Sequence, residues 1–268
     1  MSQETTGYAP VNGLQMYYEV HGEGRPLVLL HGGLQTIDLA FGGLIPHLEA
    51  GRQVIATELQ GHGRTADIDR DIELGYLAGD VAALLDHLGI GQADVLGFSL
   101  GGGVGMQLTL DHPDRVGRVI LASISYASGG FHEEITDPAR HATSTRMPTM
   151  DDFQQMQEAY ARLAPDPGHF EVFAAKASQA AANLKGWTAG ELGGITAPVL
   201  LVFGDHDFIR LEHAVEMHGL IPGAQLAVLP GATHMSVLRR TDLMVPLVQA
   251  FLDAARLASA RPGKPRRG

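Results

Sequence analysis

The chain has 268 residues, near the upper size for one domain and enough to bury a large core. Apolar residues make up 45% of it and charged residues 18%, which is typical of a globular protein and excludes a disordered chain. The formal net charge of −11 argues against nucleic acid and anionic membrane surfaces as partners, and the absence of cysteine excludes disulfides, thiolate metal sites and a cysteine nucleophile.

Localisation is predicted from the N-terminus and from the longest apolar runs. The first residues lack a basic segment followed by an apolar one, so we expect no secretory signal. No apolar run approaches the ~20 residues that a membrane helix needs. Together with the absence of cysteine, these features predict a cytoplasmic protein. The basic, Pro- and Gly-rich tail at 261–268 is expected to be disordered.

The first predicted element is a hairpin, and buried strands follow it. Asn12-Gly13 lies between two β-rich runs, which is typical of a hairpin turn. Strands that are apolar on both faces belong to a buried parallel sheet. Such runs recur along the chain at 26–33, 52–59, 93–98, 116–123, 198–205 and, more weakly, 224–231.

Helical patterns alternate with these strands. Apolar residues recur at helical spacing within 76–90, and the segments 101–111 and 241–257 are similar. Strand alternating with helix predicts right-handed βαβ units. The fold class is therefore α/β, a doubly wound and mostly parallel sheet of about eight strands flanked by helices.

A long segment between Ser123 and Thr196 breaks the alternation. It contains two amphipathic helix patterns, Thr149 to Leu163 and His169 to Leu184. Long insertions often cover sites, so this one predicts a small helical cap or lid, against the plainer alternative of two peripheral helices. The predicted division is a core of 1–122 and 191–260, a cap of 123–190 and the tail. In the first cap helix, one stripe is expected to contain Phe153, Met156 and Tyr160.

A serine among glycines carries the first chemical signal. Gly97-Phe98-Ser99-Leu100-Gly101 is G-x-S-x-G, preceded by an apolar strand and followed by a helix pattern. A sharp strand-to-helix turn holds its central residue in a strained conformation and lifts the side chain above the sheet. Side chains on the flanking residues would collide across so tight a turn. Ser99 is therefore the candidate nucleophile, and the plainer alternative is a turn serine that caps a helix.

A serine nucleophile needs a base and an acid that orients it. His234 follows the last strand in a Gly-rich loop, and Asp205 and Asp207 follow the strand before it. Loops at the carboxyl ends of parallel strands meet at one edge of the sheet. Asp207 is preferred because it lies further into its loop, whereas Asp205 is expected to tie down the turn. The predicted triad is Ser99, Asp207 and His234.

Two backbone N–H groups are predicted to form an oxyanion hole. One belongs to Leu100, directly after the nucleophile. The other comes from the loop after the strand at 26–30, where Gly33 is preferred and Leu34 is the alternative. His31 ends a buried strand, so we expect it to be structural.

With these residues, the chain resembles the α/β-hydrolase superfamily, most closely the small lidded esterases, lactonases and haloperoxidase-like members. The resemblance covers about Tyr8 to Leu257. Its motifs are His31-Gly32-Gly33, the loop from Glu58 to Thr65, the turn at Ser99 and the loops of the acid and base. The second motif looks like the family's D-x-R-G-x-G-x-S loop, with Glu, Gln and Thr replacing Asp, Arg and Ser. In the family this loop is mainly structural, and His62 is interpreted in the same way.

The resemblance also separates subfamilies. Epoxide hydrolases and haloalkane dehalogenases of this fold use an aspartate where Ser99 stands. Carbon–carbon bond hydrolases usually carry a longer oxyanion loop with a proline, which the segment from His31 to Thr36 lacks. Haloperoxidases and perhydrolases often have a proline just past the oxyanion position, where Leu34 and Gln35 stand here.

The resulting hypothesis is a carboxylesterase-like serine hydrolase that cleaves small to medium, largely apolar esters or lactones through an acyl-enzyme. It implies no organic cofactor and no metal; the expected partner is the small-molecule substrate, with a homodimer left open. The alternatives are a cofactor-free perhydrolase, haloperoxidase or lyase on the same triad, and a non-catalytic ligand-binding protein. The apolar side chains expected to line the substrate pocket, with Met150 and Met156 of the cap, are Leu34, Phe98, Tyr126, Phe131, Trp187 and Met235.

Overall fold

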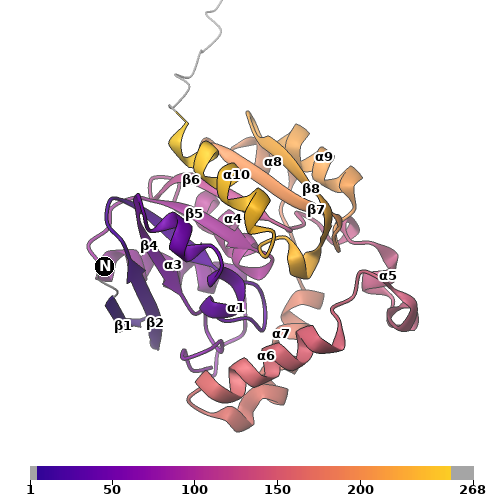
Figure 1. Cartoon of the computed structure of the whole chain (residues 1–268), viewed down its shortest axis with the longest axis horizontal. Coiled ribbons are helices and arrows are strands. Elements are labelled where there is room, and N and C mark those ends of the chain that lie inside the picture. Colours follow the sequence, from indigo (N-terminus) through magenta and orange to yellow (C-terminus); the bar gives the residue numbers. More distant parts are fainter. Residues whose placement is uncertain (1–4, 255–268) are drawn as a thin grey trace, which may run out of the picture.

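An eight-stranded sheet runs through the middle of the molecule in the order β1-β2-β4-β3-β5-β6-β7-β8 (Figure 1). The structure is a computed structural model that describes residues 5–254, so the predicted tail at 261–268 lies outside the described residues. Five neighbouring pairs, from β4 to β8, are parallel, and β1 and β2 add two antiparallel pairs at one edge. The strands are Thr5–Val11, Leu14–His21, Arg25–Leu30, Arg52–Thr57, Ala93–Phe98, Val116–Ala122, Val199–His206 and Gln225–Thr233, numbered β1 to β8.

The predicted fold class and the hairpin are confirmed. Val11 pairs with Leu14 across the two-residue turn Asn12-Gly13, where both residues have positive φ. That backbone conformation is typical of the turns that join right-twisted strands, and Asn and Gly adopt it most readily. The six apolar runs of the sequence coincide with β3 to β8 within two or three residues.

The sheet lies between two layers of helices because successive side chains of a strand point to opposite faces. In β3, Val28 and Leu30 belong to one buried apolar cluster, whereas Leu27 and Leu29 belong to the other. The first cluster includes side chains of α3 (Leu74–His87), α4 (Leu100–Asp111), α8 (Ala189–Gly193) and α9 (Leu211–Leu220). The second includes side chains of α1 (Ile37–Phe41), α2 (Ile45–Leu48) and α10 (Thr241–Asp253).

The segment between β6 and β7 is helical, and all of it is described. It contains α5 (Glu133–Thr136), α6 (Met150–Leu163), α7 (Phe170–Ala182) and α8, with three short 3-10 turns at Ser128–Gly130, Pro138–Thr143 and Pro167–His169. We call α5 to α7 and their connections the cap segment. The described residues contain no helix long and apolar enough to cross a bilayer.

The predicted apolar stripe of α6 is partly wrong. Met156 and Tyr160 are buried, but Phe153 is 44% exposed. Met150, at the start of the helix, is 83% exposed and therefore does not line an enclosed pocket. The reason is that the helix rests on the rest of the cap and the core along a narrower stripe than its apolar composition implies.

The cap segment is fixed to the loop after β4 by an apolar contact. Phe173 of α7 is fully buried, and its ring meets the ring of His62 edge-on with centroids 4.8 Å apart. Gly61 accommodates this ring, since a Cβ there would lie 2.1 Å from it. The cap therefore packs on a loop at the carboxyl edge of the parallel strands, which is the edge where sites form in such sheets.

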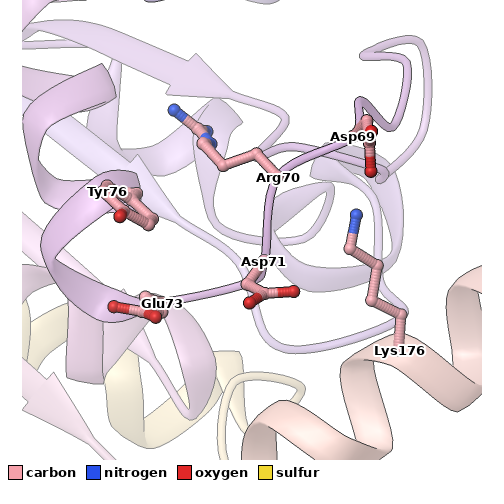
Figure 2. A pocket seen from close by; sticks show the side chains of 6 residues that line it. All are labelled: Asp69, Arg70, Asp71, Glu73, Tyr76 and Lys176. Atoms are coloured by element: carbon pink, nitrogen blue, oxygen red, sulfur yellow. The ribbon is translucent and has the colours of Figure 1, made fainter.

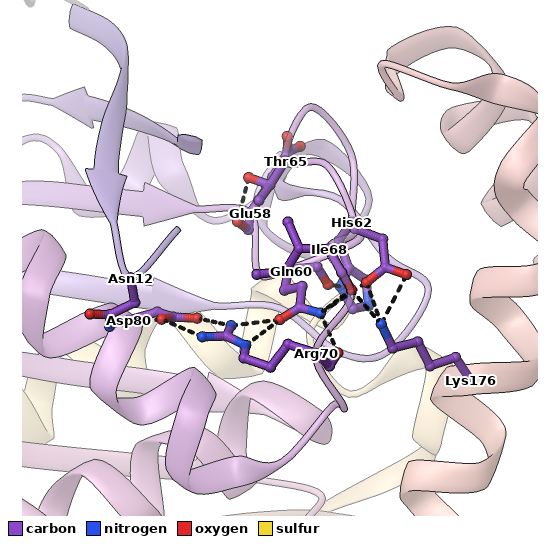
Figure 3. Close-up of polar contacts among 10 residues, drawn as sticks. Asn12, Glu58, Gln60, His62, Thr65, Ile68, Arg70, Asp80 and Lys176 are labelled. Atoms are coloured by element: carbon purple, nitrogen blue, oxygen red, sulfur yellow. Dashed lines mark hydrogen bonds and ion pairs between the residues drawn. The ribbon is translucent and has the colours of Figure 1, made fainter. Parts of the chain in front are cut away.

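A polar network joins the cap to the core beside this contact (Figure 3). Lys176 of α7 donates to both carboxylate oxygens of Asp67, at 2.8 and 3.0 Å, and His169 contacts the same carboxylate at 3.2 Å. From Asp67 the bonds continue into the core. The chain of side chains runs through Gln60, Arg70 and Asp80 to Asn12 of the hairpin turn. We call these residues the cap–core network.

Candidate active site

Ser99 occupies the turn between β5 and α4 in a strained backbone conformation, with φ +52° and ψ −115°. Ser99 as a whole is half-buried. The turn closes so tightly that a Cβ on Gly97 would lie 2.3 Å from the Gly101 carbonyl oxygen. A Cβ on Gly101 would lie 2.1 Å from the carbonyl oxygen of Leu30 on β3. Both flanking positions therefore require glycine, for the reason expected from the sequence.

The side chains of Ser99, His234 and Asp207 form one hydrogen-bonded chain. The Ser99 Oγ lies 3.0 Å from His234 Nε2, and His234 Nδ1 lies 2.7 Å from Asp207 Oδ1. Because a carboxylate only accepts hydrogen bonds, Nδ1 carries the proton and Nε2 is free to accept from the serine hydroxyl. In the chain, Ser99 lies 135 residues from His234, and Asp207 lies 27 residues from His234.

The carboxylate of Asp207 is buried and anionic. Burial acts to raise the pKa of Asp207, whereas attraction and hydrogen bonding to His234 act to lower it. Hydrogen bonds from Ser123 and Gly204 act in the same direction, and the net result is a pKa below the ordinary value for Asp. This carboxylate therefore stays charged beside the imidazole.

Asp205, which was expected to tie down the turn after its strand, bonds to neighbouring residues. Its Oδ1 accepts from the Ala232 N–H at 3.1 Å and contacts His206 Nδ1 at 2.9 Å. The first bond ties the end of β7 to β8. In the described interactions Asp205 contacts neither Ser99 nor His234, whereas Asp207 contacts His234.

The backbone around Leu100 and Gly33 is arranged to leave donors free. Leu100 is the first residue of α4, where an amide has no intrahelical partner. The Gly101 N–H donates to the His31 carbonyl at 3.0 Å, which fixes this helix start beside the loop that follows β3. In that loop Leu34 has φ +59°, and the Gln35 N–H closes a turn onto Gly32. Within residues 5–254, the amides of Leu100, Gly33 and Leu34 donate to no protein acceptor.

His31 and His62 are buried and neutral. The Nδ1 of His31 donates to the Gly32 carbonyl at 2.8 Å, and its Nε2 accepts from the Leu59 N–H at 3.1 Å. Burial lowers the pKa of His31 to about 4 and, together with the nearby His31 ring, lowers the pKa of His62 to about 3. Both rings therefore hold loops together, and neither contacts Ser99.

The six predicted pocket side chains come from several segments of the chain. Phe98 lies against the imidazole of His234 with ring centroids 5.0 Å apart, and Met235 follows that histidine and is half-buried. Leu34 lies in the loop after β3. Tyr126, Phe131 and Trp187 belong to the two ends of the cap segment and its surroundings, where Trp187 Nε1 donates to Gln107 at 2.8 Å. The assignment of all six to a substrate pocket stays a prediction.

A second serine–histidine pair joins the loop after β6 to α9. Ser125 Oγ is 2.9 Å from His213 Nε2, and Glu216 lies 3.6 Å from His213 Nδ1. The serine is buried, however, and its Oγ lies 2.5 Å from the Ala127 carbonyl, which takes the hydroxyl proton. With the hydroxyl proton on that carbonyl, His213 Nε2 donates to the Ser125 Oγ. This pair is a bonded anchor for the loop, without an accessible hydroxyl to act as nucleophile.

Two polar cavities lie elsewhere, and neither is lined by Ser99, Asp207 or His234. The first, of about 360 Å³, lies beside the cap–core network and is lined by charged side chains and one tyrosine (Figure 2). Its residues are Asp69, Arg70, Asp71, Glu73, Tyr76 and Lys176. The second, of about 490 Å³, lies between β2 and α2. Within the described residues, no group of three or more His, Asp or Glu side chains is placed to hold a metal ion.

Sequence reasoning missed two side chains that touch the triad. The phenyl ring of Phe208 lies on the His234 imidazole, and the hydroxyl of Ser123 reaches Asp207 Oδ2 at 2.5 Å. Ser123 is the first residue after β6, so its position at the carboxyl edge was readable from the sequence. The contact of Phe208 depends on the course of a loop and had no signal of its own.

The chain belongs to the α/β hydrolase fold family, whose model matches residues 25–168. It is 26% identical over 259 residues to a 2-hydroxy-6-oxo-6-phenylhexa-2,4-dienoate hydrolase of Burkholderia cepacia, covering 86% of this chain and 88% of that protein. It is 27% identical over 276 residues to a non-heme haloperoxidase of Rhodococcus erythropolis, covering 91% and 97%. Among solved structures, an enol-lactonase from Burkholderia xenovorans superposes with a TM-score of 0.71 at 24% identity, over 92% of this chain and all of that one.

Proposed function

We propose that the protein is a serine hydrolase that cleaves carboxylic esters or lactones through an acyl-enzyme. The observation that carries the proposal is the continuous hydrogen-bonded chain from Ser99 Oγ through His234 to Asp207, at 3.0 and 2.7 Å. Membership of the α/β hydrolase fold family supports it. Ser99 is half-buried and its hydroxyl faces His234, whereas Ser125 is buried and its hydroxyl donates to the Ala127 carbonyl.

The proposed reaction begins with attack of Ser99 Oγ on the substrate carbonyl while His234 Nε2 takes the hydroxyl proton. Asp207 accepts the hydrogen bond from Nδ1–H and stabilises the imidazolium that forms. The free amides of Leu100 and Gly33 stabilise the tetrahedral oxyanion. His234 then returns its proton to the leaving alcohol, and water repeats the same steps to release the acid.

The cap segment is proposed to cover this site. Three contacts support the assignment: Lys176 with Asp67, Arg239 with Asp152 at 2.9 Å, and Arg146 with the Asp207 carbonyl at 3.0 Å. They tie the cap to the loop after β4, to the loop that carries His234 and to the loop that carries Asp207. A cap held over these loops excludes water from the reacting groups, which strengthens the electrostatic interactions among them.

The test combines a fluorophosphonate probe with hydrolysis of p-nitrophenyl acetate. The wild-type protein is expected to be labelled and to release p-nitrophenol, and Ser99→Ala is expected to lose both by several orders of magnitude. Ser128→Ala, at an exposed serine, is the matched control and keeps both. A wild-type protein that neither labels nor turns over the ester contradicts the proposal and favours a binding function. A panel of esters and lactones of graded acyl length then defines the substrate.

The similar proteins suggest a second candidate function, which the same three residues would carry out. A dienoate hydrolase and a haloperoxidase each match most of the chain at 26–27% identity. Their named activities are therefore included in the panel, as hydrolysis of a 2-hydroxy-6-oxo-dienoate and as peroxide-dependent halogenation. Turnover of either compound class far above that of every ester and lactone would replace the primary proposal.

A further inference from the structure

The carboxylate of Asp207 is bound by four donors, two on each oxygen. Oδ1 accepts from His234 Nδ1 and from the Phe208 N–H, both at 2.7 Å. Oδ2 accepts from the Ser123 hydroxyl at 2.5 Å and from the Gly204 N–H at 3.2 Å. The two backbone donors are close to Asp207 in the chain, Gly204 at the end of β7 and Phe208 directly after Asp207. The two side-chain donors come from other parts of the sheet edge, since His234 follows β8 and Ser123 follows β6.

The backbone of Ser123 is in a conformation that a serine rarely adopts. Its φ is +56°, in the left-handed region that disfavours residues with a Cβ. The sheet fixes it there, because its N–H donates to the Val202 carbonyl of β7 at 2.8 Å. Strain of this kind persists where the surrounding structure enforces it, and it gathers at functional sites. Here the strained residue places its hydroxyl on a buried carboxylate.

We propose that Ser123 is a positioning residue for the acyl transfer, which orients the Asp207 carboxylate toward His234 and stabilises its charge. The inference rests on the proposed function, in which Asp207 must remain an anion when the imidazolium forms. With the Ser123 hydroxyl on Oδ2, the carboxylate cannot rotate away from the ring without losing a bond. The hydrogen bond also favours the charged form of a group that is fully buried.

Removal of the hydroxyl leaves one acceptor site of a buried carboxylate without its donor. Hydrogen bonds to charged groups are strong enough for the loss of one to lower a rate about 10- to 100-fold. Ser123 is not expected to touch the substrate, so kcat falls while KM stays within about twofold. The acid limb of the rate–pH profile moves to higher pH, because Asp207 loses a donor to its charged form.

The experiment compares Ser123→Ala and Ser123→Gly with wild type and with Ser128→Ala from the same loop. Glycine relieves the positive φ, whereas alanine keeps the strain, so a purely structural role predicts opposite effects of the two changes. The positioning role predicts the same loss of kcat in both. Wild-type kcat and an unmoved acid limb in both variants would overturn it.

The proton on His234 Nδ1 provides a readout that needs no substrate. Its downfield NMR signal reports the bond to Asp207, and it is expected to move in both Ser123 variants and to stay in place in Ser128→Ala. An unmoved signal in Ser123→Gly overturns the inference. If the wild-type protein instead fails to label or turn over any ester, the proposed function has failed, and the NMR comparison still decides whether Ser123 sets the His234–Asp207 bond.

Discussion

The phenyl ring of Phe208 lies flat on the imidazole of His234, with ring centroids 3.9 Å apart and planes 4° from parallel. The same residue donates its backbone N–H to Asp207 Oδ1 at 2.7 Å. Phe98 contacts the imidazole as well, with centroids 5.0 Å apart. The orientation of the histidine ring is thus set by two aromatic side chains in addition to the carboxylate that binds its Nδ1.

This stacking predicts that Phe208→Leu lowers kcat about 2- to 10-fold, since aromatic pairs contribute roughly 0.5–1.5 kcal/mol beyond their buried area. The backbone bond to Asp207 is unaffected by the change. Steady-state hydrolysis of p-nitrophenyl acetate measures the fall in kcat. Phe208→Tyr, which keeps the aromatic ring, serves as the control. Equal rates for the leucine variant and wild type would show that the stacked ring does not help to orient the base.

Gly101→Ala is expected to destabilise the protein by about 3 kcal/mol or more, because its Cβ meets a backbone oxygen of β3 that cannot move aside. For a chain of this size that corresponds to a fall in Tm of about 6–12 °C. Gly75→Ala in α3 is the matched control, since a Cβ there meets nothing within 4 Å. Its Tm is expected to stay level or rise, as alanine favours helix. Calorimetry of both variants decides whether the close approach of α4 and β3 fixes the turn.

Acid is expected to destabilise the fold through His31 and His62. The ordinary pKa of histidine is 6.5, and burial lowers these two pKa values to about 4 and about 3 in the folded protein. Between pH 6.5 and the lowered pKa of each histidine, the unfolded chain binds a proton that the folded chain does not. The free energy of unfolding therefore decreases as pH falls from about 6.5 to about 3. The free energy of unfolding lost over this range is on the order of 3 kcal/mol for His31 and about 5 kcal/mol for His62.

Urea unfolding between pH 7 and pH 4.5 measures this dependence. His62→Asn is expected to remove one of the two contributions and make the slope shallower by up to about 1.4 kcal/mol per pH unit. The exposed His47 provides the control variant His47→Gln, whose slope should match wild type. A slope in His62→Asn that equals the wild-type slope would mean that His62 is not held neutral by burial.

Lys176→Met should loosen the cap while leaving the core intact. It removes the bonds from Lys176 to Asp67 and to the Ile68 carbonyl, which are partly shielded from solvent. A pair of this kind contributes on the order of 1 kcal/mol, which is small against global stability but sufficient to change local opening. Hydrogen exchange of α7 is expected to increase several-fold, whereas exchange of β5 and β6 stays unchanged.

The control for this prediction is Lys185→Met, which removes an exposed lysine of the same segment. Asp67→Asn is a second test of the same network, because it weakens the acceptor that Lys176 and His169 share. If exchange of α7 in Lys176→Met equals that in the Lys185 variant, the bonds of Lys176 do not help to hold α7 on the core.

Much of the architecture was readable from local patterns. The strand runs, the helix at 74–87 and the Asn12-Gly13 turn depend on residues that are neighbours in the chain, and they were placed within a few positions. The exposure of Phe153 was not readable, because a helical stripe gives the direction of an apolar face but not the width of the surface it meets. The same holds for Met150.

The sequence by itself determined the alternation of strand and helix, the glycine-flanked turn at Ser99 and the loops in which Asp207 and His234 lie, because each depends on local spacing and backbone sterics. Only the tertiary structure decided that Ser123 binds Asp207, that Phe208 lies on His234 and that Lys176 reaches Asp67. These contacts join residues from separate loops and helices, and their distances depend on how the sheet twists and how the cap packs. Packing of this kind is a property of the whole chain, so no short stretch of residues encodes it.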